Sequence, residues 1–267
     1  MSLFLLSAGS PGNALHSALS QLADAARDDL SALPQDAANR IHELRVGMKK
    51  FRALLRLADP SLASKPLARI DELAKVIKDA FGAERDLEVS RDLLRQLVGQ
   101  RQAEAAHWKA SGPPADSAPA AAIRASAKLS ALVAGLDLSS LQPGEILEAW
   151  VASYRAGRRA LALCQTARSD DFLFHEWRKR VKQLLYQSAA LGPPAEAITS
   201  AAQLLSTTLG TLHDLAVLRE SLPHEDEEIE MILAAKKRKT AREALRLGGK
   251  VFGDKPGEAR RLLLSHE

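Results

Sequence analysis

Apolar residues recur every three or four positions along almost the whole chain, which is the period of an amphipathic α-helix. Strand-like alternation is nowhere convincing, so the pattern predicts an all-α protein. The predicted helices cover residues 13–32, 36–58, 62–81, 84–110, 119–136, 144–168, 171–191, 195–209, 212–221 and 225–248. Proline and glycine interrupt the pattern at Ser111–Pro114, Gln142–Gly144, Gly192–Pro194 and Leu222–His224. These four segments are predicted loops.

Composition agrees with helices and sets outer limits. The chain has 267 residues, enough for a sizeable core, and aromatic residues make up only 4%. Its single cysteine, Cys164, cannot form an internal disulfide, and the apolar opening Met1–Leu6 lacks the charged leader and length of a signal peptide. No apolar run approaches the roughly 20 residues needed to span a bilayer. We therefore expect a cytoplasmic protein with no membrane partner.

The helix expected over 36–58 places charge in an unusual position. Its apolar stripe consists of Leu44, Met48, Phe51 and Leu55. Arg45, Lys49, Arg52 and Arg56 each follow one residue of this stripe by one position, so they form a basic row with the same spacing. His42, three positions before Arg45, extends the row by one turn. A shift of one position is about 100° around a helix, so the row flanks the buried seam instead of facing away from it. Lys50 is a further candidate cation, around the helix from the row.

The same pattern occurs again 133 residues later, at His175, Arg178 and Lys182, with Lys179 beside it. Its apolar stripe is Trp177, Val181 and Leu184. Like charges at helical spacing repel one another and destabilise a helix slightly. A duplicated row of them therefore indicates a site for a large anion, built from two halves. The net charge of +4 is modest, so this arrangement matters more than the sum.

A second motif is repeated at nearly the same offset. Gly82–Arg91 recurs as Gly210–Arg219, 128 residues on. Each glycine is predicted to end one helix, and Asp86 and Asp214 to begin the next. Two motifs in the same order predict a duplicated unit. The expected organisation is one domain with half-repeats at about 11–141 and 142–252, followed by a flexible tail at 253–267.

Weaker basic clusters flank the second copy. Arg155, Arg158 and Arg159 precede it, and Lys236, Lys239, Arg242 and Arg246 recur at helical spacing near the end. The last group follows an acidic run, so part of its charge can pair within its own helix. From these clusters we predict only rim positions, at Arg155, Arg159, Lys239 and Arg242.

Together these motifs resemble the CHAD family, the conserved-histidine α-helical domain. The resemblance is carried by Ile41–Arg56, Phe174–Tyr186, Phe81–Val89, Leu209–Val217 and Tyr154–Ala160. It implies two antiparallel helical bundles of about four to five helices each, related by a pseudo-twofold, with a basic cleft between them. It also implies binding of inorganic polyphosphate, association with polyphosphate granules in some members, and a binding module without enzymatic activity.

The second copy departs from the family pattern. Leu185 stands where members usually carry a cation, and Gln183 replaces the cation seen at Lys50. The second wall of the cleft is therefore expected to bind less tightly. The predicted polyphosphate site consists of His42, Arg45, Lys49, Lys50, Arg52, Arg56, Arg155, Arg159, His175, Arg178, Lys179, Lys182, Lys239 and Arg242. No catalytic residue, metal ligand or cofactor is predicted, and sulfate or phosphate would mimic the ligand.

Three alternatives stay open. A metal site would use His42–Glu43 and His175–Glu176, but Val46 and Lys179 stand where an H-E-x-x-H helix has its second histidine. A phosphotransfer domain would use one exposed histidine, here His42, and would need no cationic groove, whereas this chain repeats the histidine together with a basic row. Nucleic-acid or other polyanion binding suits the basic rows, but aromatic residues are not interleaved as stacking platforms. Competition between polyphosphate and DNA at equal phosphate concentration separates the last alternative.

Overall fold

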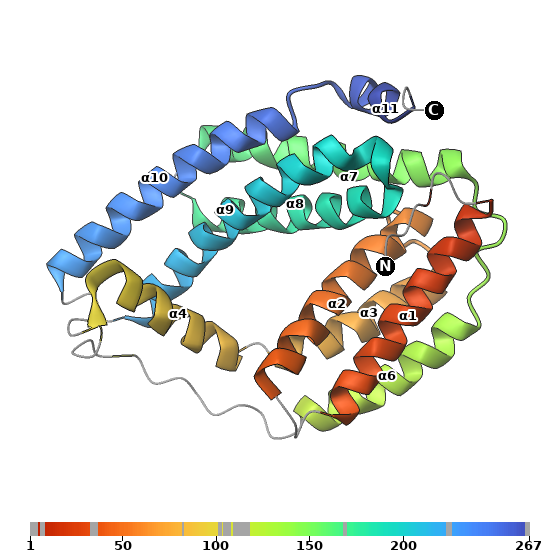
Figure 1. Ribbon diagram of the computed structural model, residues 1–267, viewed down its shortest axis with the longest axis horizontal. Helices are drawn as coiled ribbons and strands as arrows, with labels where there is room; N and C mark the ends of the chain where they lie inside the picture. The colour runs from red at the N-terminus through yellow and green to blue at the C-terminus, as the bar shows by residue number, and fades with distance from the viewer. Residues whose placement is uncertain are drawn as a thin grey trace.

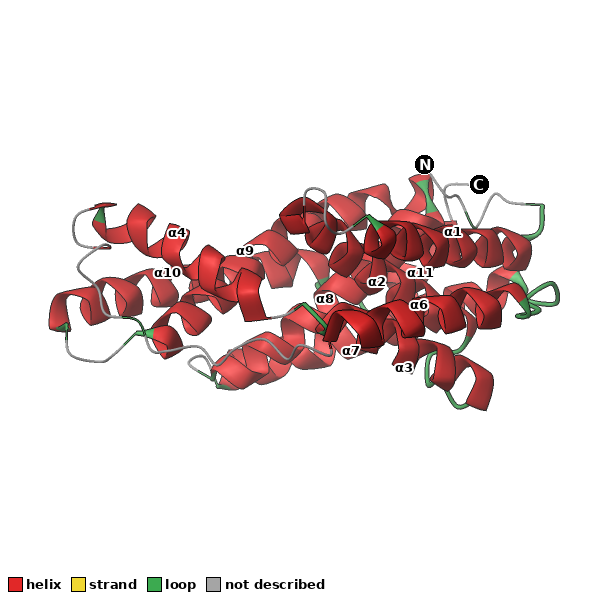
Figure 2. Cartoon of the chain, turned by 90° about the horizontal axis from the view of Figure 1, so that it is seen from below, coloured by secondary structure: helices red, strands yellow, loops and turns green. Residues whose placement is uncertain are grey.

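The computed structural model describes residues 5, 9–32, 37–81, 83–100, 103, 108, 118–167, 170–222 and 226–264. These residues form ten α-helices and one short 3-10 helix, and the described part contains no strand (Figure 2). The elements are α1 (Pro11–Ser31), α2 (Ala37–Ala58), α3 (Lys65–Asp79), α4 (Ala83–Val98), α6 (Ala118–Ala134), α7 (Pro143–Thr166), α8 (Asp171–Leu191), η1 (Pro193–Ala195), α9 (Glu196–Ser221), α10 (Glu227–Val251) and α11 (Pro256–Leu264). The all-α prediction is confirmed.

The helices pack in two groups (Figure 1). In the first group α1, α2, α3 and α6 pack on one another, and in the second α7, α8, α9 and α10 do so. The helices that carry the two repeated basic rows, α2 and α8, join the groups. α2 packs against both α7 and α8. α4 packs on α9, although it follows α3 in the chain. The internal duplication and the pseudo-twofold relation stay predictions.

Both predicted apolar stripes are buried. Leu44, Met48, Phe51 and Leu55 are at most 1% exposed, and Trp177, Val181 and Leu184 are fully buried. Burying a large apolar side chain contributes roughly 1.5–3 kcal/mol, so the stripes fix which way each motif helix faces. Gln187 adds a buried hydrogen bond from its Nε2 to the carbonyl oxygen of Ala53, 2.9 Å away. This bond ties α8 directly to α2.

Local signals define where the helices of the second group begin. The carboxylate of Asp170 accepts a hydrogen bond from the backbone N–H of Leu173 and caps α8. Asp226 caps α10 in the same way through the N–H of Ile229. α7 begins with Pro143, and Glu145 accepts from the N–H of Gln142. These caps satisfy backbone donors that a helix start leaves unpaired.

The predicted break at Gly210 is wrong. α9 continues from Glu196 through Gly210 to Ser221, and Leu209 and Leu212 on either side of the glycine are buried. Tertiary packing of this continuous stripe outweighs the weak helix propensity of one glycine. Asp214 therefore lies inside a helix and does not cap one. In the first copy, the chain does break between α3 and α4, while Gly82 itself lies outside the described residues.

Two other boundaries differ from expectation. α4 was predicted to reach residue 110 but ends at Val98. The next residue, Gly99, adopts a left-handed φ of 85°. At the other end, the tail predicted at 253–267 includes α11, which packs on α7 and buries Ala259 and Leu263. α11 follows Asp254, whose carbonyl oxygen accepts hydrogen bonds from Tyr154 and Arg158. Within the described residues, no helix is both long and apolar enough to cross a membrane.

Candidate functional site

Cations from both groups of helices converge around Lys49. This side chain is half-buried on α2, and its pKa falls from 10.5 to about 7. Burial is the largest cause, followed by the positive charges of Lys182, Arg45, Arg178 and Lys78. Two of these residues lie on α8, one on α2 and one on α3. We name Arg45, Lys49, Lys78, Arg178 and Lys182 the cationic cluster.

A pair of histidines adjoins the cationic cluster. The Nδ1 atoms of His175 on α8 and His213 on α9 lie 3.3 Å apart, and the rings are tilted by 41°. Burial, followed by the charges of Arg178, His175, Lys182 and Lys49, lowers the pKa of His213 from 6.5 to about 4. His213 is therefore neutral at pH 7 and close to both walls of the cluster.

His175 lies at the exposed end of this arrangement. Its pKa is lowered by burial first and then by Lys179 and Arg178, while Glu176 opposes the shift. Lys179 is exposed and forms an ion pair with Glu176 on its own helix, with 2.6 Å between Nζ and Oε1. Lys179 thus marks the outer edge of the site. The charge of Lys78 on α3 also lowers the pKa of His175, with a smaller effect than Lys179 and Arg178.

The guanidinium of Arg45 is held in place by the backbone. Its Nη1 donates a 2.8 Å hydrogen bond to the carbonyl oxygen of Phe81, just after α3. Its Nε is buried and has no hydrogen-bond partner among the described residues. One hydrogen bond therefore orients the guanidinium of Arg45, and its other N–H groups can still donate to an anion. His42 lies one turn earlier on α2 and is half-buried.

The two remaining members of the basic row have a structural contact. Arg52 donates from Nε and Nη2 to the carboxylate of Asp71 on α3, at 2.8 and 2.9 Å. Arg56 donates to the same carboxylate at 3.0 and 3.2 Å. Burial acts to raise the pKa of Asp71, but these hydrogen bonds outweigh it and the net pKa lies below 3.8. In the second copy Leu185 stands at the place of Arg52 and is buried.

The part of the motif that is repeated is therefore the part that converges. Arg45 and Lys49 correspond to Arg178 and Lys182, and all four belong to the cationic cluster. Arg52 has no cationic counterpart in the second copy, because its partner Asp71 serves the packing of α2 on α3. The difference at Leu185 reflects a local ion pair and leaves the shared pattern intact.

The other predicted positions are exposed cations. Among the described side chains, these exposed cations are not among the charges that shift the pKa of Lys49, His175 or His213: Lys50, Arg155, Arg159, Lys239 and Arg242. The place of these residues at a rim of the site stays a prediction. The neighbouring Arg158 instead donates to the carbonyl oxygen of Asp254 at 2.9 Å.

Two residues near Lys49, Lys78 and His213, are not among the residues predicted from the sequence. His213 stands in the repeated corner motif, at the place of Arg85 in the first copy, so both copies carry a residue that can be cationic there. That coincidence was the available signal. Lys78 is at the last turn of α3, and Ser206 stands 128 residues later. Only the tertiary packing of α3 on α2 reveals it.

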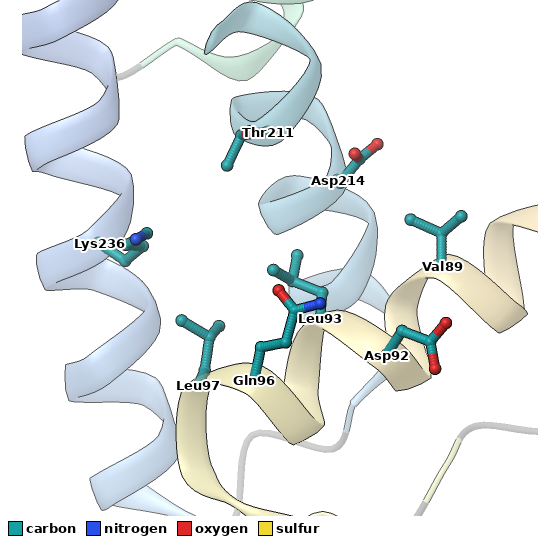
Figure 3. Close-up of a pocket in the computed structure, with 8 residues that line it drawn as sticks. All are labelled: Val89, Asp92, Leu93, Gln96, Leu97, Thr211, Asp214 and Lys236. Atoms are coloured by element: carbon teal, nitrogen blue, oxygen red, sulfur yellow. The ribbon is translucent and has the colours of Figure 1, made fainter. Parts of the chain in front are cut away.

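A separate pocket of about 540 Å³ lies between α4, α9 and α10 (Figure 3). It is lined by Val89, Asp92, Leu93, Gln96, Leu97, Thr211, Asp214 and Lys236. Two carboxylates and one ammonium group give this lining no excess of positive charge, so it does not match the cationic cluster. The described residues contain no group of three or more side chains suited to hold a metal ion.

Comparison with known proteins supports the family assignment. The family profile of the CHAD domain matches residues 13–223. "Uncharacterized protein Rv2226" of Mycobacterium tuberculosis (strain H37Rv) is 27% identical over 234 residues, which cover 79% of this chain and 45% of that protein. "Uncharacterized protein MT2285" of the CDC 1551 strain matches to the same extent. The chain thus spans about half the length of these relatives, and no solved structure gives a significant match. With its all-helical fold and a profile match over most of its length, the chain belongs to the CHAD domain family.

Proposed function

We propose that the protein binds inorganic polyphosphate at the cationic cluster. One observation carries the proposal: the half-buried Lys49 lies among positive charges from three helices, and the described charges with the largest effects on its pKa are all cations. Such an arrangement lowers the stability of the free protein, because like charges repel more strongly where water is partly excluded. A bound polyanion relieves that repulsion, which gives a reason for the arrangement.

The chemistry of the cluster suits a chain of phosphates. Arg45 and Arg178 offer planar guanidinium forks for phosphate oxygens, and Lys49, Lys78 and Lys182 offer mobile point charges. A linear polyphosphate carries about one charge per residue and no base edges, so spaced cations suffice to bind it. Because these side chains come from α2, α3 and α8, one polyphosphate chain could contact both groups of helices.

Nucleic acid is the main rival, and the positions of the aromatic rings disfavour it. Trp150, Trp177, Tyr154 and Phe51 are at most 1% exposed and pack in the core. These four rings cannot stack on bases, as the aromatic side chains of single-strand binding proteins do, whereas Phe172 at the start of α8 is 69% exposed. The duplex phosphate backbone could still meet the cluster, so competition with DNA belongs in the test.

We further propose a non-catalytic module in the cytoplasm. Phosphoryl transfer commonly uses carboxylates to hold magnesium beside the phosphates, whereas the charges acting on Lys49 are cations. The single cysteine, which cannot form an internal disulfide, suits a reducing compartment. Storage of polyphosphate, targeting to granules and regulation of a partner all fit such a module.

Titration calorimetry with linear polyphosphates of defined length tests the function. We expect binding that weakens with salt, with a log–log slope of roughly 0.7 per phosphate engaged if single-strand behaviour transfers. DNA at equal phosphate concentration should compete poorly, and pyrophosphate should bind far more weakly than long chains. Equal binding of DNA would indicate a general polyanion site, and absence of polyphosphate binding would refute the proposal.

A further inference from the structure

We infer that α4 is a strap whose docking on α9 is coupled to the anion site: α4 undocks as a unit in the free protein and is held closed when a polyanion binds. The inference rests on the proposed function, since binding at that site is what holds α4 in place. It adds a conformational response that the placement of cations alone does not supply. Two separate hydrophobic cores, and the position of the site between them, carry the inference.

The structure has a second, smaller hydrophobic core at one end. The main core takes side chains from both groups of helices, including α2, α3 and α8. The second core, which we name the distal core, lies between α4 and the adjoining ends of α9 and α10 (Figure 1). Its buried residues include Leu94, Leu215, Leu218, Leu222, Ile229 and Leu233. Among the described residues no buried side chain belongs to both cores, so the distal core can lose its packing without exposing the main one.

The distal core is what holds α4 to the rest of the molecule. Among the described helices, α4 packs mainly on α9, whereas its neighbour in the chain, α3, packs on α2 and α6. α9 and α10 contribute to both cores as continuous helices, so α4 is the element that can leave. The pocket of about 540 Å³ between α4, α9 and α10 shows that their packing is incomplete (Figure 3). Unfilled space forfeits dispersion contacts that would otherwise fix α4.

On α9, the boundary between the two cores lies at the anion site. Leu212 belongs to the main core and Leu215 to the distal core. His213 lies between them in the chain, and its Nδ1 is 3.3 Å from the Nδ1 of His175 on α8. A polyanion bound beside this histidine pair therefore acts at the point where α9 enters the distal core.

The second passage between the cores is the junction of α3 and α4. Ile77 on α3 is fully buried in the main core, and α4 begins at Ala83. Between them, the carbonyl oxygen of Phe81 accepts the 2.8 Å hydrogen bond from Nη1 of Arg45. An anion held by the other N–H groups of Arg45 fixes the guanidinium and strengthens its hold on this junction. A polyphosphate that bridges α2 and α8 thus restrains both passages, which favours the docked position of α4.

Hydrogen exchange followed by mass spectrometry tests the coupling on the full chain. In the free protein, the amides of α4 should exchange at least about tenfold faster than those of α1, which packs in the main core. A saturating long linear polyphosphate should slow the exchange of α4 by at least about fivefold, because undocking then works against the bound ligand. Calorimetry under the same conditions establishes that the site is saturated.

Two matched variants separate the strap from general stability. Leu94 in the distal core and Leu129 of α6 in the main core are both fully buried. Leu94→Ala should speed the exchange of α4 at least about tenfold and weaken polyphosphate binding about threefold or more, since the docked state is less populated. Leu129→Ala removes the same atoms but should leave both quantities within about twofold of wild type.

Each contrary outcome has a distinct meaning. If α4 exchanges as slowly as α1 in the free protein, the distal core does not open separately and the inference is refuted. Polyphosphate binding that leaves the exchange of α4 unchanged refutes the coupling, while the proposed function stands. Equal losses of affinity in Leu94→Ala and Leu129→Ala would trace the effect to general stability and contradict the strap. Absence of polyphosphate binding refutes both proposals.

Discussion

Lys182 on α8 is the charge that most strongly lowers the pKa of Lys49 on α2, after the effect of burial. The two residues are 133 positions apart and occupy the same place in the two copies of the motif. This effect agrees with the packing of α2 on α8, the two helices that carry the repeated rows. The free protein tolerates this repulsion, and the following predictions concern what that implies.

Replacing Lys49 with methionine should stabilise the free protein below pH 7. The folded-state pKa of about 7 lies below the ordinary 10.5, so folding disfavours the protonated amine. The penalty, on the order of 3 kcal/mol, is full below pH 7 and disappears as the pH rises toward 10.5. Thermal unfolding in chloride buffers should therefore show a higher Tm for Lys49→Met at pH 6.5 and a smaller difference at pH 9.5. A less stable variant at pH 6.5 would contradict the repulsion.

Replacing Arg56 with alanine should reduce stability more than polyphosphate affinity. Its guanidinium shares the buried carboxylate of Asp71 with Arg52, and losing one partner should cost about 1–3 kcal/mol. The pKa of Asp71 is depressed, so its contribution is present above its unfolded-state value of 3.8 and is lost as the pH falls further. Denaturant unfolding at pH 7 and pH 3 measures both effects. Lys50→Ala is the matched control, and a large loss of affinity without loss of stability in Arg56→Ala would overturn the structural role.

Replacing Gly210 with alanine should stabilise the protein by about 1 kcal/mol. The residue lies within α9, and a Cβ at this position would meet nothing within 4 Å. Gly248→Ala should do the opposite, because its Cβ would lie 2.5 Å from Cζ2 of the buried Trp177. Gly249→Ala, next to it with open space, controls for helix propensity. Chemical denaturation of the three variants checks the order, and a destabilising Gly210→Ala would indicate that α9 breaks there.

The amphipathic pattern was sufficient to predict the helical class and the direction in which each motif helix faces. The stripes beginning at Leu44 and Trp177 are buried as expected, because apolar burial dominates the orientation of a helix. Gly210 shows where local signals fail. A glycine ends a helix only when the chain adopts a left-handed conformation there, and packing of Leu209 and Leu212 keeps α9 continuous.

The same division holds for the candidate site. The spacing of Arg45 and Lys49, together with their repetition at Arg178 and Lys182, was visible in the chain and indicated an anion site. The pairing of Arg52 and Arg56 with Asp71 could not be predicted from the sequence, because the spacing of a basic row does not depend on a carboxylate that lies on another helix. Lys78 and His213 join the site through packing for the same reason.

The central claim is that one site joins cations from two helices, and a charge-matched comparison tests it most directly. Lys49→Gln/Lys182→Gln and Lys50→Gln/Lys239→Gln remove the same net charge, from the cationic cluster and from exposed positions respectively. Polyphosphate affinity and its salt dependence should be measured by calorimetry for both pairs. We predict a loss of at least about tenfold and a shallower salt slope for the first pair, and affinity within about threefold of wild type for the second. Equal losses in the two pairs would show that net charge governs binding and would contradict the site.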